Sequence, residues 1–299
     1  MDFHPETKIL IVDDVPTDIK VLASALSLDY RIFIATNGYD AINTAKKEAV
    51  DIVLLDVEML EIDGFEVCKR LHDEKITRNI PVIFTSSRGS AEDIAQGLSL
   101  GAFYYLTKPL NIDLLKVIIS AAVIRKNVQQ HLCGKIHSFS CPCPLLSHIK
   151  EGRFSIRTFA EALDLSVFLS LNCPNPEKAA IGLREMLVNA IEHGNLGLTY
   201  HKKTLLNQSF QLEEERERLL ALPENQSKQV MVWLSKGDRE ICFRIKDDGI
   251  GFDSAPYLNF SSERMLDTHG RGIAIAVNAS FDHVQYHGSG NEVECVLRV

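Results

Sequence analysis

The sequence predicts an α/β protein with two domains: a doubly wound parallel sheet, then a sandwich of helices on a mixed or antiparallel sheet. Three observations predict this fold class. The 299 residues are enough for two cores at the usual ~100–200 residues per domain. The first 125 or so residues alternate short apolar runs with amphipathic segments, as βα units do. The second half pairs strands across tight turns such as Lys236-Gly237-Asp238.

Five apolar runs in the first domain are predicted to be buried parallel strands, because they are continuous rather than alternating. They lie at 8–12, 31–35, 52–56, 81–85 and 103–106. Segments with helical periodicity separate them, at 16–28, 38–48, 64–73 and 90–100. A fifth helix is expected after Asn111, a favoured N-cap residue, and its pattern runs to about residue 131.

The second domain is expected over 153–299, after a first domain of 1–128 and a connector of 129–152 that lacks clear periodicity. Its predicted strands are 153–158, 229–236, 239–247, 283–287 and 292–298. Its predicted helices are 159–171, 176–195 and 272–280, with a solvated helical insertion at 200–222.

Composition excludes several classes of protein. The 32 Lys and Arg against 40 Asp and Glu give a net charge of −8, which argues against sequence-independent binding to nucleic acid. The longest apolar stretch, 114–124, is far shorter than the ~20 residues of a membrane span. The amino terminus has no signal-peptide pattern, and the seven cysteines show no disulfide framework. We therefore expect a cytoplasmic protein that binds neither nucleic acid nor membrane.

Acidic side chains end two of the predicted strands. Asp13 and Asp14 follow the first strand, and Asp56 ends the third. The carboxyl ends of such strands meet at one edge of the sheet, where the repelling carboxylates require a cation such as Mg²⁺. Thr85 ends the fourth strand and Lys108 follows the fifth, which adds a hydroxyl and an ammonium suited to a phosphoryl group.

These segments, ILIVDDVPTD, IVLLDVEMLEIDGFEVCKRL, PVIFTSS and YYLTKPL, resemble the receiver domain of bacterial response regulators over residues 8–125. The resemblance implies a flavodoxin-like (βα)5 fold in which Asp56 accepts phosphate from a histidine kinase. It also implies that Asp13, Asp14 and Asp56 hold Mg²⁺ together with the backbone carbonyl of Glu58.

The same resemblance implies a switch. Thr85 and Lys108 would contact the phosphoryl oxygens, and Tyr105 matches the aromatic residue whose rotamer follows Thr85. The bond before Pro109 would be cis.

A polar stripe marks the predicted helix of the second domain. Glu185, Asn189 and His193 are spaced i, i+4 and i+8, so they share one helix face. An acid, an amide and an imidazole can orient water, ligate Mg²⁺ and contact phosphates, whereas the alternative is an exposed polar face. Further along, Asp247, Gly249 and Gly251 follow a strand, where an acid can accept a hydrogen bond from an exocyclic amine and glycines admit a ring.

A glycine loop, His269-Gly270-Arg271-Gly272, opens the next predicted helix and suits an anion. In this order the three elements resemble the ATP-binding fold shared by gyrase, histidine kinases and MutL. The resemblance implies that Asn189 binds Mg²⁺ and Asp247 recognises adenine. The phosphate loops would be formed by Gly249, Gly251, Gly270, Arg271 and Gly272.

Within that superfamily, EMLVNAIEHGN and HGRGIAIA look most like the anti-sigma-factor serine kinases. This resemblance implies Glu185 as the general base, with His193 and Asn195 on the phosphate side. We expect a response regulator that uses Mg²⁺ and ATP, with a histidine kinase, an anti-sigma-factor antagonist or sigma factor, and a second copy of the chain as partners. The alternative is a non-catalytic, nucleotide-dependent switch that sequesters its partner.

The connector offers one more site, for zinc. Its ligand types are those of His131, Cys133, His137, Cys141, Cys143 and His148, although their spacing fits no familiar pair. Incidental linker residues are the alternative. None of these histidines lies in the phospho-acceptor motif of a sensor kinase, so a hybrid kinase is not expected. The remaining cysteines, Cys68, Cys173, Cys242 and Cys295, are predicted to fill the cores.

Overall fold

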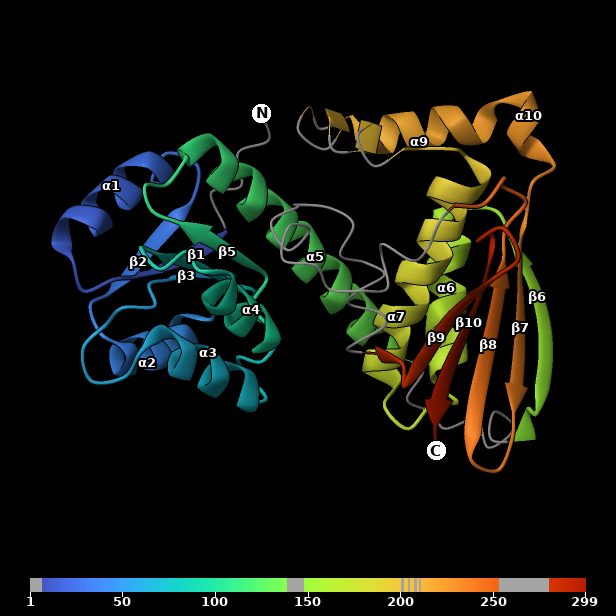
Figure 1. Cartoon of the computed structure of the whole chain (residues 1–299), viewed down its shortest axis with the longest axis horizontal. Coiled ribbons are helices and arrows are strands. Elements are labelled where there is room, and N and C mark those ends of the chain that lie inside the picture. Colours follow the sequence, from blue (N-terminus) through green and yellow to red (C-terminus); the bar gives the residue numbers. More distant parts are fainter. Residues whose placement is uncertain are drawn as a thin grey trace. The chain divides into compact units, whose positions relative to one another are not determined.

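The computed structural model describes residues 7–138, 148–199, 202–203, 205–206, 209, 211–252 and 280–299. The chain forms two compact units, the first ending at Val128 and the second beginning at Gln129 (Figure 1). Within the described residues, no helix is both long and apolar enough to cross a membrane.

The first unit is a five-stranded parallel sheet with helices on both faces, as the sequence predicts. The strand order is β2-β1-β3-β4-β5. Its strands are β1 (Lys8–Val12), β2 (Arg31–Ala35), β3 (Ile52–Leu55), β4 (Val82–Ser86) and β5 (Tyr104–Thr107). Its helices are α1 (Pro16–Leu26), α2 (Gly38–Glu48), α3 (Gly64–Asp73), α4 (Ala91–Ser99) and α5 (Ile112–Ser138).

Alternation along β1 and β3 divides the core of this unit into two layers. Leu10 and Val53 cluster with residues of α2 and α3, whereas Ile9 and Ile52 cluster with residues of α1 and α5. Figure 1 shows these two pairs of helices on opposite faces of the sheet. Side-chain caps begin several helices. Asn111 Oδ1, for example, accepts a hydrogen bond from Leu114 N at 3.0 Å, which confirms the predicted N-cap of α5.

Helix α5 is longer than the sequence pattern indicates. It continues to Ser138, so the first residues of the predicted connector are helical. The helix is fixed by Lys126, a lysine only 9% exposed, whose Nζ donates to Val50 O at 3.2 Å and pairs with Asp51 at 2.8 Å. Leu132 is buried, which gives the extension an apolar contact to favour it.

The second unit has a five-stranded sheet in which every pairing is antiparallel, in the order β6-β7-β8-β10-β9. Its strands are β6 (Glu151–Ile156), β7 (Val230–Lys236), β8 (Glu240–Lys246), β9 (His283–His287) and β10 (Glu292–Arg298). Its helices include α6 (Phe159–Ser170), α7 (Pro176–Asn189), α9 (Leu212–Ala221) and α10 (Pro223–Gln226). Figure 1 shows α6 and α7 covering one face of the sheet, which completes the predicted sandwich.

Two expectations for this unit need correction. The helix predicted over 176–195 is α-helical only to Asn189 and continues as a π-helix, η2 (Ala190–Asn195), in which Leu196 N bonds to Ile191 O at 2.9 Å. The 200–222 insertion is not simply solvated, because Leu219 of α9 is buried in the core. The helix predicted over 272–280 lies outside the described residues, apart from Ser280.

The sheet face turned away from α6 and α7 carries charged side chains in cross-strand register. Arg153, Trp233, Arg244 and Glu294 are neighbours on four successive strands. The Arg153 guanidinium lies 5.7 Å from the centroid of the Trp233 ring, and Arg244 pairs with both Glu292 and Glu294 at about 3.5 Å. Charge pairing therefore runs across this face.

Two helical glycines of the second unit should respond oppositely to alanine: Gly182 in α7, and Gly134 in the part of α5 after Val128. At Gly182 an added Cβ would lie 2.4 Å from Ser280 Cβ, whereas at Gly134 it would meet nothing within 4 Å. Gly182→Ala should destabilise the unit by about 1–3 kcal/mol through overpacking. Gly134→Ala, the matched control, should stabilise it by about 0.5–1 kcal/mol.

Urea unfolding followed by the fluorescence of Trp233, the single tryptophan of the chain, measures both changes, because the indole lies in the same unit. Equal effects of the two substitutions would contradict the close approach at Gly182.

Candidate functional sites

Three carboxylates converge at the carboxyl edge of the parallel sheet. Val12 of β1 and Leu55 of β3 are register partners, so the residues that follow them, Asp13 and Asp56, emerge side by side. Oxygens of Asp13, Asp14 and Asp56 lie within 4.8 Å of one another. Asp13 is fully buried and Asp56 is 3% exposed. The structure thus brings together the side chains that the sequence places at these strand ends.

Among the described residues, one cation pairs with this cluster. Lys108 follows β5 through a cis bond to Pro109, as the resemblance implies. Its Nζ lies 2.8 Å from Asp13 Oδ2, 2.7 Å from Asp18 Oδ2 and 3.5 Å from Asp56 Oδ1. Asp18, in the first turn of α1, is absent from the residues expected at this site. Its spacing of four from Asp14 is the only sequence signal for it.

The charges of this edge are unbalanced. Burial raises the pKa of Asp56 to about 6, and of its two charged neighbours Lys108 opposes the rise while Asp13 adds to it. Burial also disfavours the charged Lys108, but hydrogen bonds to Asp13 and Asp18 outweigh it and hold the pKa of Lys108 above its ordinary value. Among the described residues, Asp56 Oδ1 has no hydrogen-bond partner. A hard divalent cation fits this oxygen-rich set.

The predicted switch residues lie at the same edge. Thr85 is buried in β4, next to Leu106 in register. Tyr105 is turned inward, with its ring 5.6 Å from that of Phe84 and its hydroxyl donating to Arg88 O at 2.9 Å. The side chain of Glu58 accepts a hydrogen bond from Ser87 Oγ. The role of the Glu58 carbonyl as a Mg²⁺ ligand stays a prediction.

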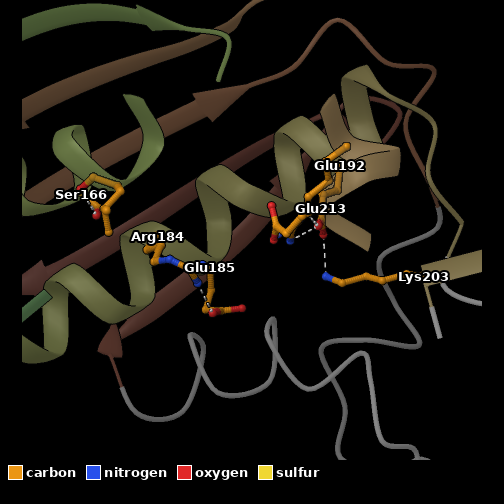
Figure 2. A network of polar contacts seen from close by, with 8 residues as sticks. Ser166, Arg184, Glu185, Glu192, Lys203 and Glu213 are labelled. Carbon is orange, nitrogen blue, oxygen red and sulfur yellow. Dashed lines mark hydrogen bonds and ion pairs between the residues drawn. The ribbon is translucent and has the colours of Figure 1, made fainter. Parts of the chain in front are cut away.

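In the second unit, the polar stripe spans the junction of α7 and η2. Glu185 pairs with Arg184 at 3.2 Å (Figure 2). Asn189 Nδ2 is buried and has no hydrogen-bond partner among the described residues. His193 Nδ1 donates to the carbonyl of Leu198, and burial, followed by the charge of Lys203, lowers the pKa of His193. The stripe thus offers a neutral imidazole and an amide with unused donors.

The Asp247 loop lies directly against η2. Gly249 N donates to Asp247 Oδ1 at 2.8 Å, and burial raises the pKa of Asp247 to about 6. An added Cβ on Gly194 would lie 2.2 Å from Asp247 Cγ. Glycine at 194, to which the sequence analysis assigns no role, is therefore what lets the helix approach the carboxylate.

Asn195 holds the same loop. It is 2% exposed, and its Oδ1 accepts a hydrogen bond from Asp248 N at 2.8 Å. Lys228 Nζ donates to its carbonyl at 2.7 Å. In this conformation Asn195 positions the Asp247 loop, and a contact with phosphate stays a prediction.

The β9–β10 turn also belongs to this site, although no sequence motif points to it. Gly251 has a φ of +83°, and an added Cβ there would lie 2.2 Å from Ser289 O. Asn291 Nδ2 donates to Asp247 O at 3.2 Å and to Gly249 O at 3.4 Å. The backbone of Ser289 therefore leaves no room for a side chain at position 251, and this alone accounts for the glycine. The predicted loop residues Gly270, Arg271 and Gly272 lie outside the described residues.

The described part of the connector gives no support to the zinc site considered above. There, His137 Nδ1 bonds to the Cys133 carbonyl at 2.7 Å. Among the described residues, the only group of side chains placed to hold a metal ion is Asp13, Asp14 and Asp56. Cys141 and Cys143 lie outside them. Of the four predicted core cysteines, Cys242 is only half-buried, because it alternates with the core residues of β8.

Replacing Asp56 with Asn should stabilise the cation-free protein. Because the pKa of Asp56 is about 6 in the folded state, against an ordinary 3.8, its charge opposes folding above pH 6. This penalty fades as the pH falls from 6 toward 3.8. Asp56→Asn should therefore gain about 1–3 kcal/mol at pH 8 and little at pH 4.

Calorimetry with chelator measures this gain, and saturating Mg²⁺ should shrink it, since the cation supplies the missing charge. A gain that is independent of both pH and Mg²⁺ would contradict the electrostatic origin.

Comparison with known proteins identifies both units. Residues 9–120 match the response regulator receiver domain, and residues 155–297 match the histidine kinase-like ATPase domain. A probable cyclic di-GMP phosphodiesterase of Vibrio cholerae is 41% identical over 116 residues, which cover 39% of this chain and 26% of that protein. Response regulator PleD of Caulobacter vibrioides is 39% identical over 105 residues, 35% of this chain and 23% of its own length.

This chain therefore spans about a quarter of the length of these relatives. Among solved structures, the chemotaxis protein CheY4 of Vibrio cholerae is 29% identical, with a TM-score of 0.36, over 38% of this chain and 95% of that one. With the matched ranges placed on the two units, the chain consists of a response regulator receiver domain followed by a histidine kinase-like ATPase domain.

Proposed function

We propose that the chain is a two-component response regulator in which phosphorylation of Asp56 by a histidine kinase controls an ATP-binding output domain. The observation that carries this proposal is the edge where oxygens of Asp13, Asp14 and Asp56 lie within 4.8 Å of one another and Lys108 reaches Asp13 and Asp56. An Asp56 carboxylate oxygen would attack the phosphorus of a phosphohistidine. The P–N bond would break, the imidazole would leave, and an acyl phosphate would form on Asp56.

The neighbouring residues have distinct tasks in this transfer. Asp13, Asp14, Asp56 and the carbonyl of Glu58 would hold Mg²⁺, which neutralises phosphoryl charge when bound. Lys108 would contact a phosphoryl oxygen, and its hydrogen bond to Asp18 at 2.7 Å is the contact it would have to exchange.

Thr85 would contact a second phosphoryl oxygen from β4. We place Tyr105, which is turned inward and hydrogen-bonded to Arg88 O, after Thr85 in this switch. Its rotamer would report the change at Thr85.

For the output domain we propose an ATP-dependent serine/threonine kinase of the anti-sigma-factor type. Asn189 would hold Mg²⁺ through its side-chain oxygen, and Asp247 would bind the exocyclic amine of adenine. Glu185, at 32% side-chain exposure, would take the proton of the substrate hydroxyl as general base. The substrate would be a serine or threonine of an anti-sigma-factor antagonist.

A second candidate is a non-catalytic switch that sequesters a sigma factor or another partner when nucleotide is bound. The observation that favours it is the ion pair of Glu185 with Arg184, which keeps the proposed base engaged. In either version we propose domain limits of 1–128 and 153–299 with a connector between them, and a second copy of the chain as a further partner.

Phosphorylation should depend completely on one carboxylate. With acetyl phosphate and Mg²⁺, the wild-type chain should acquire one acid-stable, base-labile phosphoryl group, and Asp56→Asn should acquire none, because the amide cannot attack. Intact-mass measurement detects the adduct. The control Asp73→Asn, at an exposed position at the end of α3, should be modified like the wild type. An adduct on Asp56→Asn would contradict the assignment.

The output reaction separates the two candidate functions. Incubation with labelled ATP and candidate antagonists should transfer label to a serine or threonine, with and without beryllofluoride on the receiver domain. Glu185→Gln should lower this transfer by about 100-fold or more while leaving ATP affinity within about twofold. Glu177→Gln, on the same helix, is the control. Signalling that survives Glu185→Gln favours the binding switch, and a chain that binds no ATP excludes both.

A further inference from the structure

A fully buried carboxylate lies in the same π-helical turn as His193 and Asn195 of the proposed nucleotide site. Glu192 occupies η2, three residues after Asn189 and one before His193, and its side chain is 0% exposed. Neither candidate function uses it. Carboxylates are almost never fully buried unless cations and hydrogen bonds surround them, so its partners identify what holds this part of the site.

Both partners come from the 200–222 insertion. Lys203 Nζ lies 2.5 Å from Glu192 Oε2 (Figure 2). Arg216 Nε lies 2.7 Å from Glu192 Oε1, which also accepts from Arg216 Nη2. The Arg216 guanidinium also lies 4.5 Å from the ring centroid of Phe159, at the start of α6. Through Arg216, the insertion therefore contacts both η2 and the start of α6.

The charges of this cluster nearly balance. Burial tends to raise the pKa of Glu192, but Lys203 and Arg216 outweigh burial and hold the pKa below its ordinary value. Glu192 is therefore ionised at neutral pH. The second cationic charge is offset by Glu213, which pairs with Arg216 from an exposed position. Glu213 thus touches the same arginine without touching η2.

Restraint at Glu192 reaches the groups that would bind nucleotide. Its carbonyl accepts a hydrogen bond from Leu198 N at 2.8 Å, and the carbonyl of Leu198 in turn accepts from His193 Nδ1. Two residues after Glu192, Gly194 packs on the Asp247 carboxylate. The wide π-turn therefore sets the imidazole and the loop approach together, directly after Asn189.

We propose that Glu192, held by Lys203 and Arg216 of the insertion, is a positioning residue that fixes the π-helical turn in the geometry that binds Mg²⁺–ATP. This inference rests on the proposed nucleotide binding. The insertion then contributes to nucleotide binding, because Lys203 and Arg216 hold Glu192 in place. Glu192 in turn acts through the η2 backbone on Asn189, His193 and Gly194.

The test compares Glu192→Gln with Glu213→Gln in the full chain. Both substitutions remove one carboxylate that pairs with Arg216, but only the first acts on η2. Isothermal titration with Mg²⁺–ATP should show an affinity about tenfold or more weaker for Glu192→Gln, the range typical of residues that orient a ligand's contacts. Glu213→Gln should stay within about twofold of the wild type. Arg216→Lys, which keeps the charge, should fall between them.

A second readout needs no nucleotide. Imidazole NMR of the free chain follows the titration of His193, which faces the charges of Glu192, Lys203 and Arg216. Glu192→Gln should lower the pKa of His193 further, because the negative charge of Glu192, which raises that pKa, is lost. Glu213→Gln should leave it nearly unchanged. Trp233 fluorescence confirms that each variant folds. If Glu192→Gln does not fold, Lys203→Met and Arg216→Lys are judged by the same affinity criterion.

The outcomes are distinct. Weaker Mg²⁺–ATP binding by folded Glu192→Gln, with Glu213→Gln unaffected, supports the positioning role. Unchanged affinity in folded Glu192→Gln overturns that role and leaves the proposed ATP binding intact, whatever its melting temperature. A wild-type chain that binds no Mg²⁺–ATP overturns the proposed function and this inference with it.

Discussion

Electrostatic repulsion among buried carboxylates is the constraint on which the first unit depends. Parallel pairing of β1 with β3 forces Asp13 and Asp56 to leave the sheet side by side, where water is excluded and like charges interact strongly. Among the described residues, the one ammonium at this edge is that of Lys108. It is shared by Asp13, Asp18 and Asp56. A divalent cation would offset the remaining negative charge, so the affinity of this edge for a cation follows from the strand register.

The second unit depends on a different constraint, which is the close approach of glycine backbone to neighbouring groups. Gly194 lets η2 reach the Asp247 carboxylate, and Gly251 lets its loop reach the β9–β10 turn. Asn195 and Asn291 then fix the loop with side-chain hydrogen bonds. Because any Cβ at either glycine would overlap its neighbour, this site depends on the absence of side chains as much as on the polar groups it presents.

Local patterns predict most of this arrangement from the sequence. Continuous apolar runs followed by acids locate the strands and the first site, since the register of a parallel sheet leaves those acids few places to go. The same logic fails for Asp18, because the reach of a flexible lysine depends on its rotamer. It fails for the π-turn and for Glu192 as well: Lys203 and Arg216 lie 11 and 24 residues further along the chain, and no periodicity connects such positions. The residues of α5 beyond 131 begin with the buried Leu132, which the helical pattern alone does not single out.

The face of the second sheet that turns away from α6 and α7 has a consequence for molecular recognition. Its charges already neutralise one another across β8 and β10, and Arg153 covers the one large indole. An indiscriminate hydrophobic ligand would gain little there, because the guanidinium and its carboxylate neighbours would have to give up favourable contacts first. Only a surface that presents its own complementary pattern of acids and bases could replace those contacts. This face is therefore built for selective binding and not for general hydrophobic association.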